Sequence, residues 1–111
     1  MNFTLNSQEI SLHEQFNGRY DFTAIGNTLN LVENNSSTNC TILTGSSANL
    51  ELEPTQNITA AYLYWAGSGA GDFSVNLNAS IITPDRTFSF TYSSKLFFAG
   101  FKDVTQIVQS Q

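Results

Sequence analysis

The dominant pattern along this chain is the strict alternation of apolar and polar residues over short stretches, which is typical of half-buried β-strands. Each alternating stretch predicts one strand, and the stretches recur at short intervals. They are residues 2–6, 9–13, 48–54, 72–78 and 86–92. Gly, Pro, Asn and Asp between them supply turn residues, so the pattern favours short antiparallel strands joined by tight connections.

A hairpin is predicted near the N-terminus, at Asn17–Gly18. This pair adopts positive φ at both turn positions readily, so residues 11–16 should pair with residues 19–25. Tyr20, Phe22 and Ala24 would then share one face. From residue 26 to residue 47 the alternation loosens. Leu29, Leu31, Ile42 and Leu43 mark short strand segments around a polar loop at residues 33–39.

Residues 60–66 differ, because both alternation sets are apolar. Ala61, Leu63 and Trp65 would lie on one face and Tyr62, Tyr64 and Ala66 on the other. Such a strand is usually central and covered on both sides, so we expect it to be buried with Trp65 in the core. The glycine-rich stretch at residues 67–71 predicts the turn after this strand.

The C-terminal stretch changes from strand to helix periodicity after an apolar run at residues 95–101. Asp103 is a suitable N-cap with Gln106 three residues later, and Val104, Ile107 and Val108 follow at helical spacing. The whole pattern predicts eight to ten strands in an all-β, antiparallel sandwich or jelly-roll-like fold with one short C-terminal helix. Residues 1–111 would form one such module, or the N-terminal part of a larger and here incomplete one.

Composition narrows the function classes. Hydrophobic residues make up 41% of the chain, enough for a core, whereas charged residues make up only 12% and the net charge is -5. The four basic residues argue against nucleic acid and anionic membrane surfaces, and no apolar stretch is long enough to predict membrane insertion. The 12 Asn, 13 Ser and 12 Thr residues favour an extracellular β domain. Cys40 and His13 are each the single residue of their type, which excludes an internal disulfide and a Cys/His zinc site.

Two binding hypotheses arise from the aromatic stretch and the polar residues C-terminal to it. Tyr62, Tyr64 and Trp65 could form a stacking platform for sugar rings, against the alternative that they belong to the core. Hydroxyl groups of a sugar, or a calcium ion, would then be bound by Asp72, Asn76 and Asn78. Asp72 and Asp85 are weak calcium candidates, because no calcium-loop spacing accompanies them.

An enzymatic role is not predicted. Glu51 and Glu53 are two acids on one strand face, as glycoside hydrolysis requires, but that spacing is also the ordinary solvated side of a strand. No nucleophile elbow is present. We therefore expect no catalytic residues.

The series of segments from Gln15 to the C-terminus resembles a known family. The most specific phrases are "AYLYWAGSG" at residues 61–69 and "KDVT" at residues 102–105. They resemble the N-terminal region of large secreted, adhesin-like surface proteins of Bacteroidetes that carry a gliding-motility-associated (type IX secretion) C-terminal sorting domain. The resemblance implies a non-catalytic structural or adhesion module at the cell surface. Its partners would be other domains of the same protein, with polysaccharides or surface glycans as the ligands of a carbohydrate-binding alternative.

Overall fold

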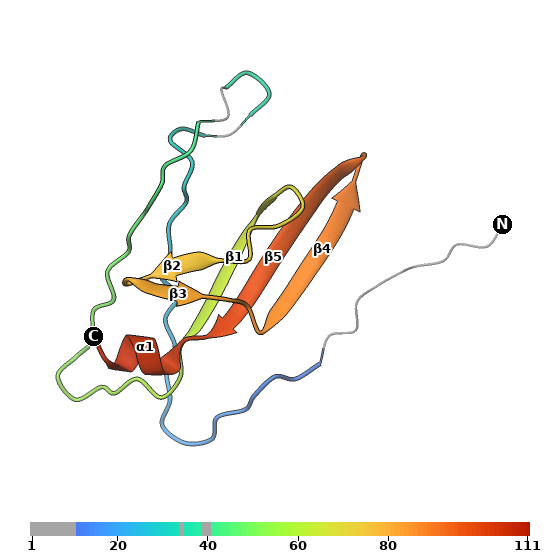
Figure 1. The fold of residues 1–111 in the computed structure, drawn as a ribbon. Helices are drawn as coiled ribbons and strands as arrows, with labels where there is room; N and C mark the ends of the chain where they lie inside the picture. The colour runs from blue at the N-terminus through green and yellow to red at the C-terminus, as the bar shows by residue number, and fades with distance from the viewer. Residues whose placement is uncertain (1–10, 34, 39–40) are drawn as a thin grey trace. The chain divides into compact units, whose positions relative to one another are not determined.

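The computed structural model describes residues 11–33, 35–38 and 41–111. Contacts divide the chain into two compact units, residues 1–51 and residues 52–111. All helices and strands of the described residues lie in the second unit, in the order β1, β2, β3, β4, β5, α1 (Figure 1). The prediction of one module over residues 1–111 stays a prediction.

The larger sheet has three antiparallel strands in the order β1-β5-β4. The strands are β1 (Tyr62–Ser68), β4 (Arg86–Tyr92) and β5 (Lys95–Asp103). Figure 1 shows β5 between the other two. The smaller sheet is the antiparallel pair β2 (Val75–Leu77) and β3 (Ser80–Ile82). The helix α1 (Thr105–Gln109) comes directly after β5.

Two tight turns set the register of the hairpins. Ser93 and Ser94 join β4 to β5 with φ of 50° and 63°, and Asn78 and Ala79 join β2 to β3 with φ of 47° and 65°. Positive φ at both central residues is the type I′ geometry, whose twist matches that of the flanking strands. The chain uses this geometry at both turns without glycine, so neither turn carries the usual sequence signal.

Aromatic rings packed on glycines join β1 to β5. Trp65 lies opposite Gly100 and Gly67 lies opposite Phe98 in the register. A Cβ atom on Gly100 would lie 2.5 Å from Cε2 of the Trp65 indole, and one on Gly67 would lie 2.9 Å from Cε1 of Phe98. Each glycine therefore provides the space that the facing ring occupies.

The helix begins at Thr105 with Val104 as its N-cap, one residue later than the cap predicted at Asp103. Asp103 still accepts the backbone N–H of Thr105 through Oδ1, at 3.0 Å. The predicted helix is confirmed. The shift follows from the position of Val104, which is buried and whose backbone N–H donates to the Ala61 carbonyl at 2.9 Å.

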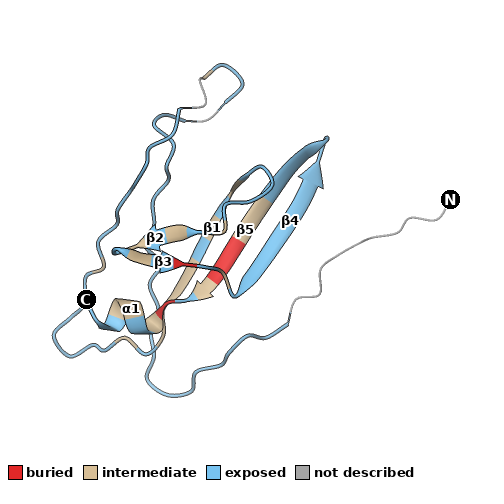
Figure 2. Cartoon of the chain, in the orientation of Figure 1, coloured by how far each residue is buried: buried red, intermediate tan, exposed pale blue. Residues whose placement is uncertain are grey.

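The core is small. Among the described residues the buried apolar side chains are Ile82, Phe101 and Val104, from β3, from β5 and from the residue before α1 (Figure 2). Phe101 and Val104 lie close together in the chain, where β5 ends and α1 begins. Most other large apolar side chains are only half-buried or exposed.

The first unit departs from the sequence predictions. Its described residues contain one isolated bridge, Asn30 with Ile42, supported by the Leu43 N–H bonded to the Leu29 carbonyl at 2.7 Å. The strands predicted at residues 11–16 and 19–25 are absent there, and only a bend with Gly18 at φ 129° remains. A lone hairpin is marginally stable unless its apolar face is covered, and Phe22 is 91% exposed.

Two further strand predictions are corrected. Residues 48–54 form no strand, and Leu52 is exposed. The strand predicted at residues 60–66 is present as β1 (Tyr62–Ser68), but β1 is an edge of its sheet rather than the centre, Tyr64 is exposed, and Trp65 is only half-buried rather than part of the core. The strand predicted at residues 2–6 and the start of the one predicted at residues 9–13 lie outside the described residues.

The described chain is thus mostly β, with five antiparallel strands in two small sheets and one short C-terminal helix. This confirms the predicted fold class at that level. A closed sandwich or jelly roll is not seen among the described residues.

The glycine contact predicts a specific sensitivity. Gly100→Ala should lower the free energy of unfolding by about 1–3 kcal/mol, because the added methyl group must displace the Trp65 ring. The measurement is urea unfolding followed by the fluorescence of Trp65, the single tryptophan. Gly45→Ala is the control, since a Cβ there meets nothing within 4 Å. Equal stabilities of the two variants would contradict the proposed packing.

Candidate functional site

The three-stranded sheet has two chemically different faces, because side chains alternate along each strand and neighbours in register share a face. Trp65, Gly67, Phe98 and Gly100 lie on one face, here called the glycine face. The opposite face, here called the aromatic face, carries aromatic residues from all three strands. They are Tyr62, Tyr64, Phe88, Phe90, Tyr92, Phe97 and Phe101.

The aromatic face is open over most of its length. Tyr64 is 70% exposed, Phe90 65% and Tyr92 69%, and all of β4 is exposed in Figure 2. Phe101 is the exception at 5% exposed. Its ring centroid lies 5.0 Å from that of Tyr64 and 5.6 Å from that of Tyr62. Tyr64 thus packs against Phe101 at one end of the face while it remains exposed, and Phe90 and Tyr92 present their rings to solvent toward the other end.

Few charges interrupt this face. The guanidinium carbon of Arg86 lies 5.7 Å from the Phe101 ring centroid, within cation–π range. At the opposite end Lys95 lies across from Tyr92. Contiguous apolar surface of this kind marks an interaction site more often than it marks an ordinary protein surface.

The predicted stacking platform is divided by the sheet. Tyr62 and Tyr64 belong to the aromatic face, whereas Trp65 belongs to the glycine face. The Trp65 indole N–H donates to the Asp72 backbone carbonyl at 2.7 Å. This bond holds the loop after β1 against the ring and satisfies the indole, so these three aromatics do not present one common surface.

The predicted polar partners lie on β2 and around it. Asp72 is in the loop between β1 and β2, and its carboxylate accepts the Ser74 N–H at 3.4 Å. Asn76 is an exposed residue of β2, and Asn78 is the first residue of the β2–β3 turn. Their role in binding stays a prediction.

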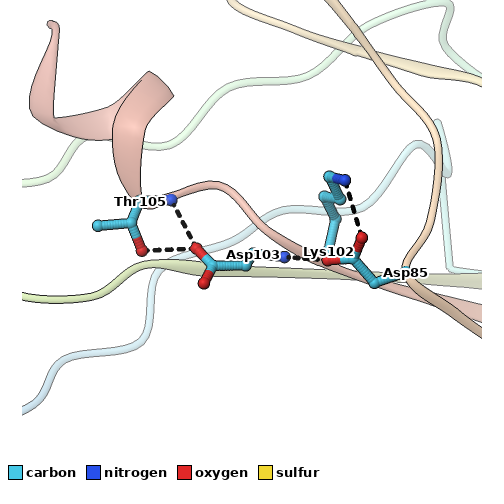
Figure 3. A network of polar contacts seen from close by, with 4 residues as sticks. All are labelled: Asp85, Lys102, Asp103 and Thr105. Atoms are coloured by element: carbon cyan, nitrogen blue, oxygen red, sulfur yellow. Dashed lines mark hydrogen bonds and ion pairs between the residues drawn. The ribbon is translucent and has the colours of Figure 1, made fainter.

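Asp85 belongs to a chain of polar contacts at the start of β4 (Figure 3). Its Oδ1 lies 2.8 Å from Nζ of Lys102, and its Oδ2 accepts the Asp103 N–H at 3.1 Å. The Lys102 hydrogen bond and the Asp103 N–H hold the pKa of Asp85 below its ordinary value of 3.8. Because Asp85 is already paired, a calcium ion would have to replace the Lys102 ammonium group there.

The same contacts continue to the helix and to β1. Thr105 donates its hydroxyl to Asp103 Oδ1 at 2.6 Å, and Thr105 Oγ1 accepts the Ala61 N–H at 3.0 Å. Residues 102–105 and residues 61–69, the two phrases most specific to the resemblance, are therefore bonded to each other. The sequence patterns assigned no role to Thr105 or Lys102. Only the proximity of these phrases in a folded sheet would have indicated one.

Residues considered for catalysis and metal binding are dispersed. Within residues 11–33, 35–38 and 41–111, no three His, Cys, Asp or Glu side chains form a group that could hold a metal ion. Glu51 and Glu53 are exposed and lie outside any strand. His13 is exposed too, and Cys40 lies outside the described residues.

Comparisons of the chain with protein-family models, with curated proteins and with solved structures gave no match. In the described part of the chain, no helix has the length and apolar character needed to cross a bilayer. The exposure of Tyr64, Phe90 and Tyr92 makes the aromatic face the candidate site.

Asp85 predicts an acid-sensitive contribution to stability. Its depressed pKa stabilises the fold above the pKa of the unfolded chain, and this contribution is lost as the pH falls below about 4 through the folded-state value. Asp85→Asn should therefore unfold with a weaker pH dependence between about pH 5 and about pH 2. Urea midpoints across that range measure it. An unchanged slope in Asp85→Asn would contradict the pairing.

Proposed function

We propose that this chain is a non-catalytic structural and adhesion module of an extracellular bacterial surface protein, and that it acts through the aromatic face of its three-stranded sheet. The observation that carries the proposal is the exposure of Tyr64, Phe90 and Tyr92 on one face. The resemblance to adhesin-like surface proteins and the abundance of Asn, Ser and Thr support the extracellular setting.

The energetics favour a covered aromatic face. Burying one large apolar side chain contributes about 1.5–3 kcal/mol. Phe90, Tyr64 and Tyr92 are each about two-thirds exposed, so covering them together would contribute about 3–6 kcal/mol, a large fraction of the about 5–15 kcal/mol stability of a small domain. A surface that gains this much from contact is well suited to cohesion between modules.

The same face fits the finer fold that the sequence predicts. In a sandwich, a second sheet packs about 10 Å from the first, and the inner faces interdigitate. The aromatic face would be the inner face, and neighbouring domains of the same surface protein would supply the second sheet. In this arrangement the chain is one part of a larger β-sandwich.

Carbohydrate binding is the second candidate, and one observation favours it. Tyr64 and Tyr92 expose phenol rings on the same face, and such rings stack on sugars while their hydroxyls bond to water or ligand. The register places Tyr64 across from Phe101 and Tyr92 across from Lys95, toward opposite ends of the face, so each ring would be a separate stacking position, and Trp65 on the other face would take no part.

A surface-binding experiment tests the proposal. Adsorption of the chain to an alkyl-coated sensor and to polysaccharide-coated sensors is measured by quartz microbalance. Tyr64→Ser/Phe90→Ser should bind the alkyl surface about tenfold more weakly or worse, since two exposed rings are lost. Its melting temperature should fall, because the Tyr64 ring packs against Phe101 with ring centroids 5.0 Å apart, so adsorption is compared at a temperature at which both proteins are folded.

Ile81→Ser is the matched control, because Ile81 is 74% exposed but belongs to β3. Equal losses in both variants would mean that general hydrophobicity, and not the aromatic face, causes adsorption. Binding to one polysaccharide with a raised melting temperature would favour the carbohydrate-binding candidate. Release of reducing sugar from any polysaccharide would contradict a non-catalytic module.

A further inference from the structure

The edge strand β4 has a symmetric sequence. Its residues Arg-Thr-Phe-Ser-Phe-Thr-Tyr are the same in either direction over Thr87–Thr91, with Ser89 at the centre. The whole strand is exposed, and β5 pairs with one of its two edges. In the described part of the chain no strand pairs with the other edge.

An unpaired edge presents alternate N–H and C=O groups that can continue a sheet. Natural edge strands are usually protected by charges, prolines or bulges. Residues 87–91 contain no charge and no proline. Arg86 at the start of β4 is the one charge of this strand, so the central residues of the edge lack the usual protection against pairing with another strand.

A two-fold axis through Ser89 satisfies both the backbone and the side chains. Antiparallel pairing about that axis places Ser89 opposite Ser89 of the second copy, Thr87 opposite Thr91 and Phe88 opposite Phe90. In this register odd-numbered residues lie opposite odd-numbered ones and even-numbered residues opposite even-numbered ones. The backbone groups that point away from β5 in the two copies therefore face each other. The aromatic faces of both sheets also lie on the same side. A shift by one residue would place Phe side chains on opposite faces, which this register avoids.

We propose that two copies of this chain associate through β4, about a two-fold axis at Ser89, to form one six-stranded antiparallel sheet. The partner is a second copy because the sequence of Thr87–Thr91 is symmetric, so the strand pairs with itself through matching residues. Pairing with a different strand would not call for a symmetric sequence. The inference goes beyond the proposed function, since it depends on the edge of the sheet and not on what covers its aromatic face.

The cross-strand pairs support this register. Thr–Thr and aromatic–aromatic pairs each contribute favourably relative to alanine pairs. Arg86 would lie opposite Tyr92 of the second copy, so no like charges meet across the axis. Pairing would also join the two aromatic faces into one surface twice as wide.

Disulfide trapping tests the axis. In a Cys40→Ser background, Ser89→Cys places two cysteines opposite each other, about 4.5–5.5 Å apart between Cα atoms, which a disulfide spans. Thr87→Cys is the control on the same edge and the same face. The two cysteines at position 87 would be offset by about four residues along the strands, about 14 Å apart, which is too far for a disulfide.

The expected result is rapid disulfide dimer formation by Ser89→Cys under mild oxidation, and at least about tenfold slower formation by Thr87→Cys, whose sulfur atoms cannot meet in this register. Equal rates for both variants, as random collision would give, would overturn the proposal. A faster rate for Thr87→Cys would overturn it as well.

Sedimentation of the otherwise unaltered chain gives an independent test. The wild type should be a dimer that dissociates on dilution, and Ser89→Lys should be monomeric, because two ammonium groups would meet on the axis. Ser89→Asp should be monomeric for the same reason, and a mixture of the two variants should restore the dimer. This rescue excludes misfolding as the cause of dissociation.

A monomeric wild type at every concentration would overturn the proposal, and so would a dimer that persists in Ser89→Lys. Adsorption of the Ser89→Lys variant tests the proposed function separately, because Ser89 lies across from Phe98 on the glycine face and the aromatic face keeps Tyr64, Phe90 and Tyr92. Failure of this inference and failure of the proposed function are therefore distinguishable.

Discussion

The packing of two aromatic rings on two glycines is the contact on which the three-stranded sheet depends. Trp65 opposes Gly100 and Phe98 opposes Gly67, so rings and glycines alternate between the two strands. Phe73 adds an edge-on contact to Phe98, with ring centroids 5.5 Å apart. On this face the large rings pack directly against the backbone of the neighbouring strand, because glycine has no side chain there. The remaining aromatic residues of β1, β4 and β5 alternate with this set and must lie on the other face.

A second constraint acts at the end of the sheet where Asp85, Asp103 and Thr105 meet. Here the residue before β1, the residue before β4, the end of β5 and the start of α1 are connected by hydrogen bonds. Of the three buried apolar residues in the part of the chain that the structure describes, Phe101 and Val104 lie in this same stretch. Polar and apolar contacts thus coincide at one end, which leaves the far ends of β4 and β5 as the least buried part of the sheet.

The local sequence pattern predicted the elements whose contacts are close in the chain. It failed where a strand forms only if another part of the protein covers its apolar face. Alternation over residues 86–92 and the helical spacing after Asp103 were sufficient for β4 and α1. The same alternation at residues 11–25 did not become a hairpin, because its apolar side chains have no cover among the described residues. The apolar character of residues 60–66 indicated burial on both faces, yet β1 lies at an edge. Period two does place Tyr64 and Trp65 on opposite faces, so the division of the predicted platform was predictable. The glycines that accept Trp65 and Phe98 were not, since the register between β1 and β5 is a property of the fold.

The two-residue turn at Ser93–Ser94 has a consequence for the order in which the sheet assembles. It lets β4 and β5 pair by a local event, and hairpins of this kind form in about 1–10 μs. The partner of β5 on its other side, β1, ends at Ser68, so once the hairpin has formed the chain from Gly69 to Asp85 must still close before β1 and β5 meet. Loop closure of that length costs entropy that only the finished contacts recover. We therefore expect the β4–β5 hairpin to form first and β1 to pair with it afterwards, when the Trp65 ring packs on Gly100.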